Sequence, residues 1–167
     1  MAAAKRKVNP KSKASKRRSP RSAPGDAIAL LRADHATVEG LFDQFEKTRN
    51  DAKKLKLAQR ICAELTIHTT IEEELFYPAA REAIRDEDLL DEAEVEHASA
   101  KELISQIEAG APADDKWSAK VTVLGEYIKH HVKEEQNEMF PKVRKTKLDL
   151  KALGEEMAAR KAQLQSA

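Results

Sequence analysis

Four histidines and two glutamates stand at spacings that could bind transition metals. If the chain around them is helical, each of four segments places one histidine on its apolar stripe, and two segments add a glutamate one turn further along. Imidazole and carboxylate donors without a thiolate suit iron, zinc, copper or nickel better than Mg²⁺ or Ca²⁺, which prefer all-oxygen shells. The candidate metal ligands are His35, His68, Glu72, His97, His131 and Glu135.

The alternative for any one of these histidines is a hydrogen-bonded core residue. Two inward glutamates favour a metal site over this alternative, because burying an unpaired carboxylate costs several kcal/mol. Six donors exceed the need of one tetrahedral zinc and suit two metals that share bridging carboxylates. Ferritin-type di-iron bundles use Glu-x-x-His on two helices, whereas only Glu94 and His97 have that spacing here. The pattern therefore favours a metal pair of another class.

Apolar residues repeat at helical spacing through four long segments joined by short turns, and this pattern predicts an all-α, up-down-up-down four-helix bundle. Pro78 is expected to bend or break the second segment, and Pro112 with the Asp114–Asp115 pair to open the fourth. A short amphipathic helix in residues 146–167 is expected to pack on the bundle or on a partner. The four expected segments are 26–50, 51–84, 86–109 and 112–145.

The bundle sequence is an internal repeat of one helical hairpin. The segment from His68 to Pro78 aligns without gaps onto the segment from His131 to Pro141, and Asp34-His35 aligns with Glu96-His97. Each copy thus carries a lone histidine followed by His-x-x-x-Glu. Such repetition predicts a site with pseudo-two-fold symmetry between the two halves.

Charge is divided unevenly along the chain. Residues 1–25 hold nine Lys or Arg and no acid, which leaves 21 basic against 29 acidic residues in 26–167. The first 25 residues lack apolar periodicity and are expected to form a disordered basic arm, either a solvated tail or a weak, non-specific contact for nucleic acid. No uncharged stretch is long enough to span a membrane, and the single cysteine excludes an internal disulfide. We expect a soluble, cytoplasmic protein.

The ordered motif resembles the hemerythrin family, specifically the HHE cation-binding, hemerythrin-like domains, over roughly residues 26–145. It consists of Asp34-His35, His68-x-x-x-Glu72, Glu96-His97 and His131-x-x-x-Glu135. The resemblance implies a cofactor of two non-haem iron ions, joined by an oxo or hydroxo bridge inside the bundle. It further implies that Glu72 and Glu135 bridge the metals and that His35, His68, His97 and His131 are terminal ligands.

One position departs from the oxygen-carrying members, which place a second histidine four residues after the one in the third helix. Lys101 stands there. The departure favours a more open, reactive or sensing centre over reversible oxygen storage. Lys101 itself is expected at the surface, with contact to a bound anion as the alternative.

Four other residues are candidates of lower rank. His130 is expected behind the ligands or at the surface, although it too precedes a glutamate by four. Glu39 follows His35 by four but has no counterpart in the repeat. Tyr127 could donate a hydrogen bond near the centre, but we expect ordinary packing, and Cys62 is expected to be an inert core residue.

The leading hypothesis is a non-haem di-iron protein that binds O₂ or a related small ligand, NO or peroxide, as a sensor, scavenger or iron-handling protein. Whether it is an enzyme stays open. The alternatives are a peroxidase or catalase-like enzyme at the same centre, and a regulator in which the metal controls contacts made by residues 1–25 or the last helix. No membrane is expected as a partner, and the sequence identifies no protein partner.

Overall fold

The computed structural model describes residues 25–167, so the predicted basic arm lies outside the described residues apart from Gly25. The described chain is helical and contains no strand. Its elements are α1 (Ala27–Lys47), α2 (Asp51–Ile71), η1 (Glu72–Phe76), α3 (Tyr77–Ile84), α4 (Glu87–Glu108), α5 (Trp117–Glu134), η2 (Glu135–Met139), α6 (Phe140–Arg144) and α7 (Leu150–Ser166).

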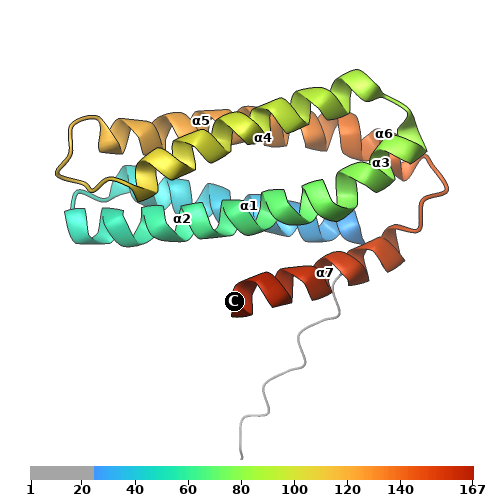
Figure 1. Ribbon diagram of the computed structural model, residues 1–167, viewed down its shortest axis with the longest axis horizontal. Helices are drawn as coiled ribbons and strands as arrows, with labels where there is room; N and C mark the ends of the chain where they lie inside the picture. The colour runs from blue at the N-terminus through green and yellow to red at the C-terminus, as the bar shows by residue number, and fades with distance from the viewer. Residues whose placement is uncertain (1–24) are drawn as a thin grey trace, which may run out of the picture.

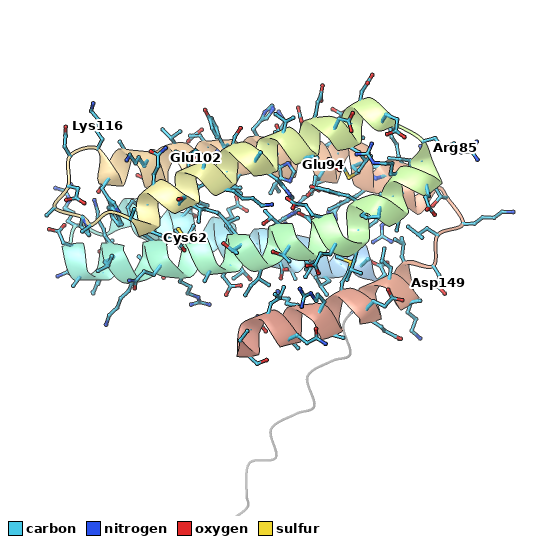
Figure 2. The ribbon with its side chains drawn as sticks, viewed as in Figure 1. Cys62, Arg85, Glu94, Glu102, Lys116 and Asp149 are labelled. Atoms are coloured by element: carbon cyan, nitrogen blue, oxygen red, sulfur yellow. The ribbon has the colours of Figure 1, made fainter. Side chains whose placement is uncertain are left out.

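These elements form four long rods and one additional helix (Figure 1). The first rod is α1, the second is α2 continued through η1 into α3, the third is α4, and the fourth is α5 continued through η2 into α6. Successive rods run up and down, as predicted, and the loops at Arg85 and Lys116 lie at opposite ends of the bundle (Figure 2). No helix of residues 25–167 is both long and apolar enough to cross a membrane.

Side-chain caps fix where the helices begin. Asp26, Asn50, Asp86 and Asp149 each precede a helix and accept a hydrogen bond from a backbone N–H of its first turn. These bonds satisfy donors that a helix start otherwise leaves unpaired. The caps agree with the predicted starts of the first three rods.

The start of the fourth rod differs from the prediction. Pro112 and the two aspartates do not open the helix, which begins instead at Trp117. Asp114 accepts a hydrogen bond from the backbone N–H of Ala111 at 2.7 Å and so closes a turn. The indole of Trp117 then donates to the carbonyl of Ile107 at 3.0 Å, which ties the new helix to the end of α4.

Two short π-helical turns, η1 and η2, lie within the second and fourth rods, and η1 stands just before Pro78, where a bend or break was expected. In each, a backbone N–H bonds to the carbonyl five residues earlier: Tyr77 to Glu72, and Phe140 to Glu135. Pro78 follows at the start of α3, where its missing N–H costs little. Each π turn begins at one of the two predicted glutamate ligands, and π turns are frequent at functional sites.

The core consists of two apolar clusters with a polar layer between them. One cluster contains Leu31, Ile71, Ala93 and Met139, and the other contains Val38, Leu65, Ala100 and Ile128. Each rod therefore passes from one cluster to the other at its central histidine. This arrangement holds the predicted metal site in the middle of the bundle, away from both loop ends.

Helix α7 packs against α1 and α2 outside the four rods (Figure 1). It buries Leu153 and Met157 in the apolar cluster that contains Leu31. The two backbones approach closely at Gly154, where a Cβ would lie 2.7 Å from the backbone nitrogen of Ala27. Gly154 is therefore required for this docking.

We expect Gly154→Ala to lower the free energy of unfolding by about 1–2 kcal/mol, because the clash with the α1 backbone outweighs the better helix propensity of alanine. Gly40→Ala is the matched control, since a Cβ there meets nothing within 4 Å. The control should raise the free energy of unfolding by about 0.5–1 kcal/mol. Urea unfolding of both variants measures the difference, and a Gly154→Ala protein as stable as the wild type would contradict the close approach.

Candidate metal centre

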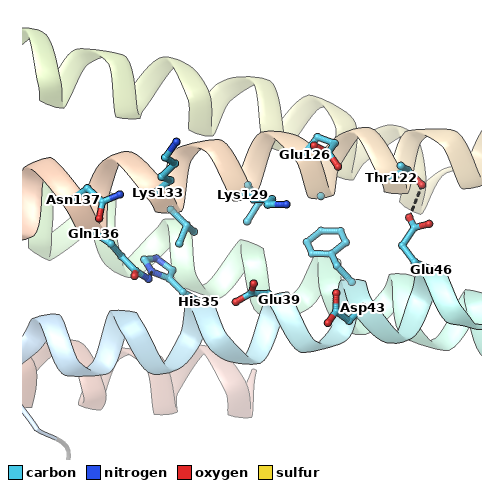
Figure 3. Close-up of a pocket in the computed structure, with 14 residues that line it drawn as sticks. His35, Glu39, Asp43, Glu46, Thr122, Glu126, Lys129, Lys133, Gln136 and Asn137 are labelled. Atoms are coloured by element: carbon cyan, nitrogen blue, oxygen red, sulfur yellow. Dashed lines mark hydrogen bonds between the residues drawn. The ribbon is translucent and has the colours of Figure 1, made fainter.

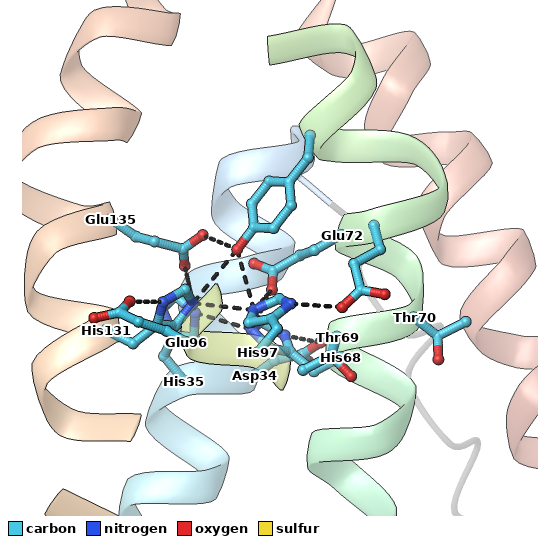
Figure 4. Close-up of polar contacts among 12 residues, drawn as sticks. Asp34, His35, His68, Thr69, Thr70, Glu72, Glu96, His97, His131 and Glu135 are labelled. Carbon is cyan, nitrogen blue, oxygen red and sulfur yellow. Dashed lines mark hydrogen bonds and ion pairs between the residues drawn. The ribbon is translucent and has the colours of Figure 1, made fainter. Parts of the chain in front are cut away.

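All six predicted ligands are buried, and their side chains meet in the polar layer (Figure 4). Among the described residues, the buried polar side chains are these six together with Asp34 and Thr69. Four different rods contribute one histidine each. The pseudo-two-fold repeat in the sequence therefore becomes a pseudo-symmetric cluster in space.

The imidazole Nε2 atoms point toward one another. The Nε2 atoms of His35 and His68 are 3.0 Å apart, and those of His97 and His131 are 3.2 Å apart. Two nitrogens bound at right angles to one metal ion, each at about 2.1 Å, would be separated by about 3 Å. Each pair thus has the spacing of two ligands of a common ion.

The two glutamates lie between the histidine pairs. Oε2 of Glu72 is 3.2 Å from Nε2 of His68 and 3.3 Å from Nε2 of His97. Oε2 of Glu135 is 3.3 Å from Nε2 of His35 and 3.6 Å from Nε2 of His131. Each carboxylate therefore approaches a histidine of both halves, which is the position of a bridging ligand.

Three of these carboxylate oxygens lack a hydrogen-bond partner in residues 25–167: both oxygens of Glu72 and Oε2 of Glu135. Buried polar atoms are rarely left unpaired, because the lost hydration is not recovered. Bound cations would supply the missing partners. The donor atoms also form two groups that share Glu72, namely His35, His68, Glu72 and Glu135, and Glu72, His97 and His131.

The outer nitrogen, Nδ1, of each histidine faces another polar side chain. Three of these partners are carboxylates: Asp34 at 3.5 Å from His68, Glu73 at 3.0 Å from His97, and Glu96 at 2.7 Å from His131. A carboxylate only accepts, so Nδ1 carries the proton and Nε2 keeps its lone pair for a metal. At His35 the partner is the amide of Gln136, 3.1 Å away.

Two of these outer carboxylates are in turn held by lysines. Lys101 donates to both oxygens of Glu73, at 2.6 and 2.7 Å, and Lys161 of α7 donates to Asp34. Lys101 thus lies at the surface and acts on His97 through Glu73, rather than pointing at the centre. Burial raises the pKa values of Asp34 and Glu73, but the hydrogen bonds to their histidine and lysine partners outweigh it and lower both.

Tyr77 is the buried residue at the centre that the sequence analysis did not single out. Its hydroxyl donates to Oε1 of Glu135 at 2.9 Å and lies 3.1 Å from Nε2 of His97 and 3.4 Å from Nε2 of His131. Burial, reinforced by the charge of Glu135, raises the pKa of Tyr77 well above its usual value, so the phenol keeps its proton. Tyr127, expected to pack, is instead 52% exposed.

The remaining candidates lie away from the polar layer. His130 and Glu39 are exposed, and Glu94 pairs with Arg81 at 2.9 Å on the surface. Cys62 is buried in an apolar cluster, and burial raises the pKa of its thiol to about 12. A thiol in this environment is unreactive at neutral pH.

Without metal, the two central carboxylates cannot both be ionised at low cost. Burial, with the charge of Glu135 beside it, raises the pKa of Glu72 well above its usual value. Burial also lowers the pKa of His97 to about 4, aided by the charge of His131. The metal-free centre therefore keeps a proton on Glu72 and a neutral imidazole at His97.

A groove of about 580 Å³ runs between α1 and α5 and reaches His35 (Figure 3). Acidic side chains, including Glu39 and Asp43, line its α1 side, and Lys129 and Lys133 lie along α5. A second, internal cavity of about 10 Å³ is lined by all four central histidines and has room for about one water-sized molecule. His35, Ile128 and Val132 line both spaces, so they form the wall between the groove and the centre.

Comparison with known proteins agrees with this geometry. The model of the hemerythrin HHE cation-binding domain family matches residues 26–143. A crystal structure of a hemerythrin HHE cation-binding domain-containing protein from Mycobacterium kansasii is similar with a TM-score of 0.73 at 26% identity, over 85% of this chain and 88% of that chain. A curated relative from Nostoc sp., named a DNA nickase, is 29% identical over 115 residues, which are 69% of this chain. The match covers only 32% of that relative, so the chain spans about a third of its length.

We expect Glu72→Gln to stabilise the metal-free protein while it weakens metal binding. The folded-state pKa of Glu72 lies above the unfolded value, so its contribution to stability is present at low pH and is lost as the pH rises through that raised pKa. Glutamine has no charge to bury, so its advantage should grow as the pH rises above the usual glutamate pKa and should reach about 1–3 kcal/mol.

Thermal and urea unfolding of the metal-free proteins at several pH values measures this effect. Glu74→Gln is the matched control, because the neighbouring Glu74 is exposed and bonds to Arg160 at 2.7 Å. It should bring no stabilisation at any pH. A Glu72→Gln protein less stable than the wild type throughout would show that the buried carboxylate is not under strain.

Proposed function

Because the chain belongs to the hemerythrin HHE cation-binding domain family, we propose that its buried cluster holds two non-haem iron ions and binds a small ligand: O₂, NO or peroxide. One observation carries the proposal. Three buried carboxylate oxygens without hydrogen-bond partners among the described residues face four imidazole Nε2 atoms, at the middle of an apolar bundle. A pair of bound cations would supply these oxygens with the partners that hydrogen bonds do not provide.

The donor set suits iron. Imidazole and carboxylate ligands without thiolate are typical of non-haem iron, and the two donor groups share a carboxylate as a pair of neighbouring ions requires. We assign His35 and His68 to one ion and His97 and His131 to the other. Glu72 and Glu135 would bridge them, since each lies between histidines of both halves.

Bound iron would supply direct coordination of the small ligand and exchange of electrons with it. The chain itself would exclude bulk water, because the apolar clusters close both ends of the polar layer. The cavity of about 10 Å³ would admit only a very small molecule. The Tyr77 hydroxyl would hold a proton within hydrogen-bond distance of the centre.

Sensing, scavenging or iron handling fits this centre better than oxygen storage. Lys101 occupies the position where oxygen-carrying members place a further histidine, and its ammonium group bonds to Glu73 instead of facing the metals. One ion would therefore have fewer protein nitrogens. Its remaining positions would be open to a ligand beside the hydroxyl of Tyr77.

The test is the metal content and spectrum of protein purified without oxygen and reconstituted with Fe²⁺. We expect two irons per chain and a near-ultraviolet absorption band that develops on exposure to air. Glu135→Gln should lose iron, whereas Glu39→Gln should keep two, although both residues follow a histidine by four. Wild-type protein without stoichiometric iron, or equal loss in both variants, would refute the assignment.

Peroxide consumption at the same centre is the second candidate, favoured by the buried hydroxyl of Tyr77. Two molecules of hydrogen peroxide would give two of water and one of O₂, so no other reductant is needed. We expect Tyr77→Phe to keep its iron but to release O₂ from peroxide about a hundredfold more slowly, since a positioned proton donor is lost.

An oxygen electrode measures this rate, with iron content determined on the same samples. Tyr127→Phe is the control, because that hydroxyl belongs to an exposed side chain. Unchanged O₂ release from iron-loaded Tyr77→Phe would exclude the proton-donor role. No release from the wild type would leave ligand binding without turnover as the function.

A further inference from the structure

The outer carboxylates around the centre differ in how their charge is balanced. Asp34 and Glu73, which face His68 and His97, each accept a hydrogen bond from a lysine ammonium group. Glu96 plays the same part for His131, with its Oε2 at 2.7 Å from Nδ1. In residues 25–167, however, neither Lys nor Arg pairs with Glu96.

Beside Glu96, a histidine and a second carboxylate occupy the place that a lysine occupies beside Asp34 and Glu73. Nε2 of His130 is 3.4 Å from Oε1 of Glu96 and 3.2 Å from Oε1 of Glu134. Within the part of the chain that the structure describes, Glu134 also forms no ion pair with Lys or Arg. Two carboxylates thus converge on one imidazole, and among the described residues neither carboxylate forms an ion pair with a lysine or arginine.

We propose that Glu96, His130 and Glu134 form a peripheral binding site for a divalent first-row transition metal, separate from the central pair. One nitrogen and two oxygen donors lie within 4.8 Å of one another, as three ligands of one ion do. Imidazole with carboxylates suits Zn²⁺, Co²⁺ or Ni²⁺. His130 is 63% exposed, so an ion can enter from solution and keep water in its other positions.

The helices supply the geometry of this site. His130 and Glu134 are one turn apart on α5 and so share a face, and Glu96 reaches them from α4. A cation bound there would balance Glu96 as Lys161 balances Asp34 and Lys101 balances Glu73. Since the second oxygen of Glu96 accepts from His131, the peripheral ion would be linked to the centre through one carboxylate.

The peripheral site belongs to one half of the repeat. The alignment that superposes His68 on His131 puts Ile67 and Ile71 at the positions of His130 and Glu134. The first half therefore has neither donor, and Lys161 occupies the outer side of Asp34 there. This site does not follow from the central ligand motif, and it does not require iron to occupy the centre.

The experiment is equilibrium dialysis and calorimetric titration of the iron-free full chain with Zn²⁺ near neutral pH. The wild type should bind one Zn²⁺ more than His130→Ala, and Glu134→Gln should bind this ion roughly tenfold or more weakly. Glu138→Gln, which removes an exposed acid one turn beyond Glu134, should match the wild type. All three changes lie on partly or fully exposed side chains, and circular dichroism verifies their folding.

The number of Zn²⁺ ions bound by the wild type minus the number bound by His130→Ala tests the peripheral site. If the central cluster binds no Zn²⁺, the total falls equally in the wild type and in His130→Ala. The difference of one ion between the two proteins remains. Equal Zn²⁺ uptake by the wild type and His130→Ala would overturn the peripheral site. A loss of the same ion in Glu138→Gln would overturn it as well, because binding would then depend on surface charge in general.

Discussion

The burial of two carboxylates at the middle of the bundle is the main electrostatic demand on this structure. Glu72 and Glu135 are 0% and 1% exposed, and between them three oxygens find no hydrogen-bond donor among the described residues. Such burial opposes folding unless cations or protons compensate for it. The converging histidines, the apolar clusters on both sides and the central position all serve to place two negative charges where metal ions can compensate for them.

The compensation extends outward in layers of alternating charge. Behind the histidines lie Asp34, Glu73 and Glu96, which fix the imidazole rings by accepting from Nδ1. Behind two of these carboxylates lie lysines, and one lysine comes from α7. The last helix is therefore more than a cover for apolar surface, since it contributes Lys161 to the network that orients His68. Orientation of this kind commonly changes metal affinity by about 10–100-fold.

Helical spacing alone was enough to predict the bundle and the central cluster, because residues three or four apart share a face of a helix. Tyr77 could not be found in this way. The π turn that starts at Glu72 inserts an extra residue into the helical repeat, so Phe76 and Tyr77 turn inward in place of Leu75. The available signal is Pro78, which recurs as Pro141, because each proline closely follows a π turn. The contacts of the outer carboxylates could not be predicted for a different reason, since they join different rods and depend on how the rods pack.

The repeat is nearly symmetric in its predicted ligands and asymmetric in what surrounds them. Tyr77 aligns with Phe140, whose ring stacks on His35 with centroids 6.0 Å apart. Glu73, which faces His97, aligns with Gln136, which faces His35. A carboxylate partner makes an imidazole a stronger donor than an amide does. His97, whose outer partner is a carboxylate, is therefore a stronger electron-pair donor than His35, and it also lies beside the hydroxyl of Tyr77.

The groove reaches the opposite half, at His35. The groove and the hydroxyl of Tyr77 thus lie against different histidines of the centre: the groove reaches His35, and the hydroxyl lies 3.1 Å from His97 and 3.4 Å from His131. Two copies of one hairpin have thus formed a central cluster whose two halves differ in their neighbours, because one half faces the groove and the other faces a buried phenol.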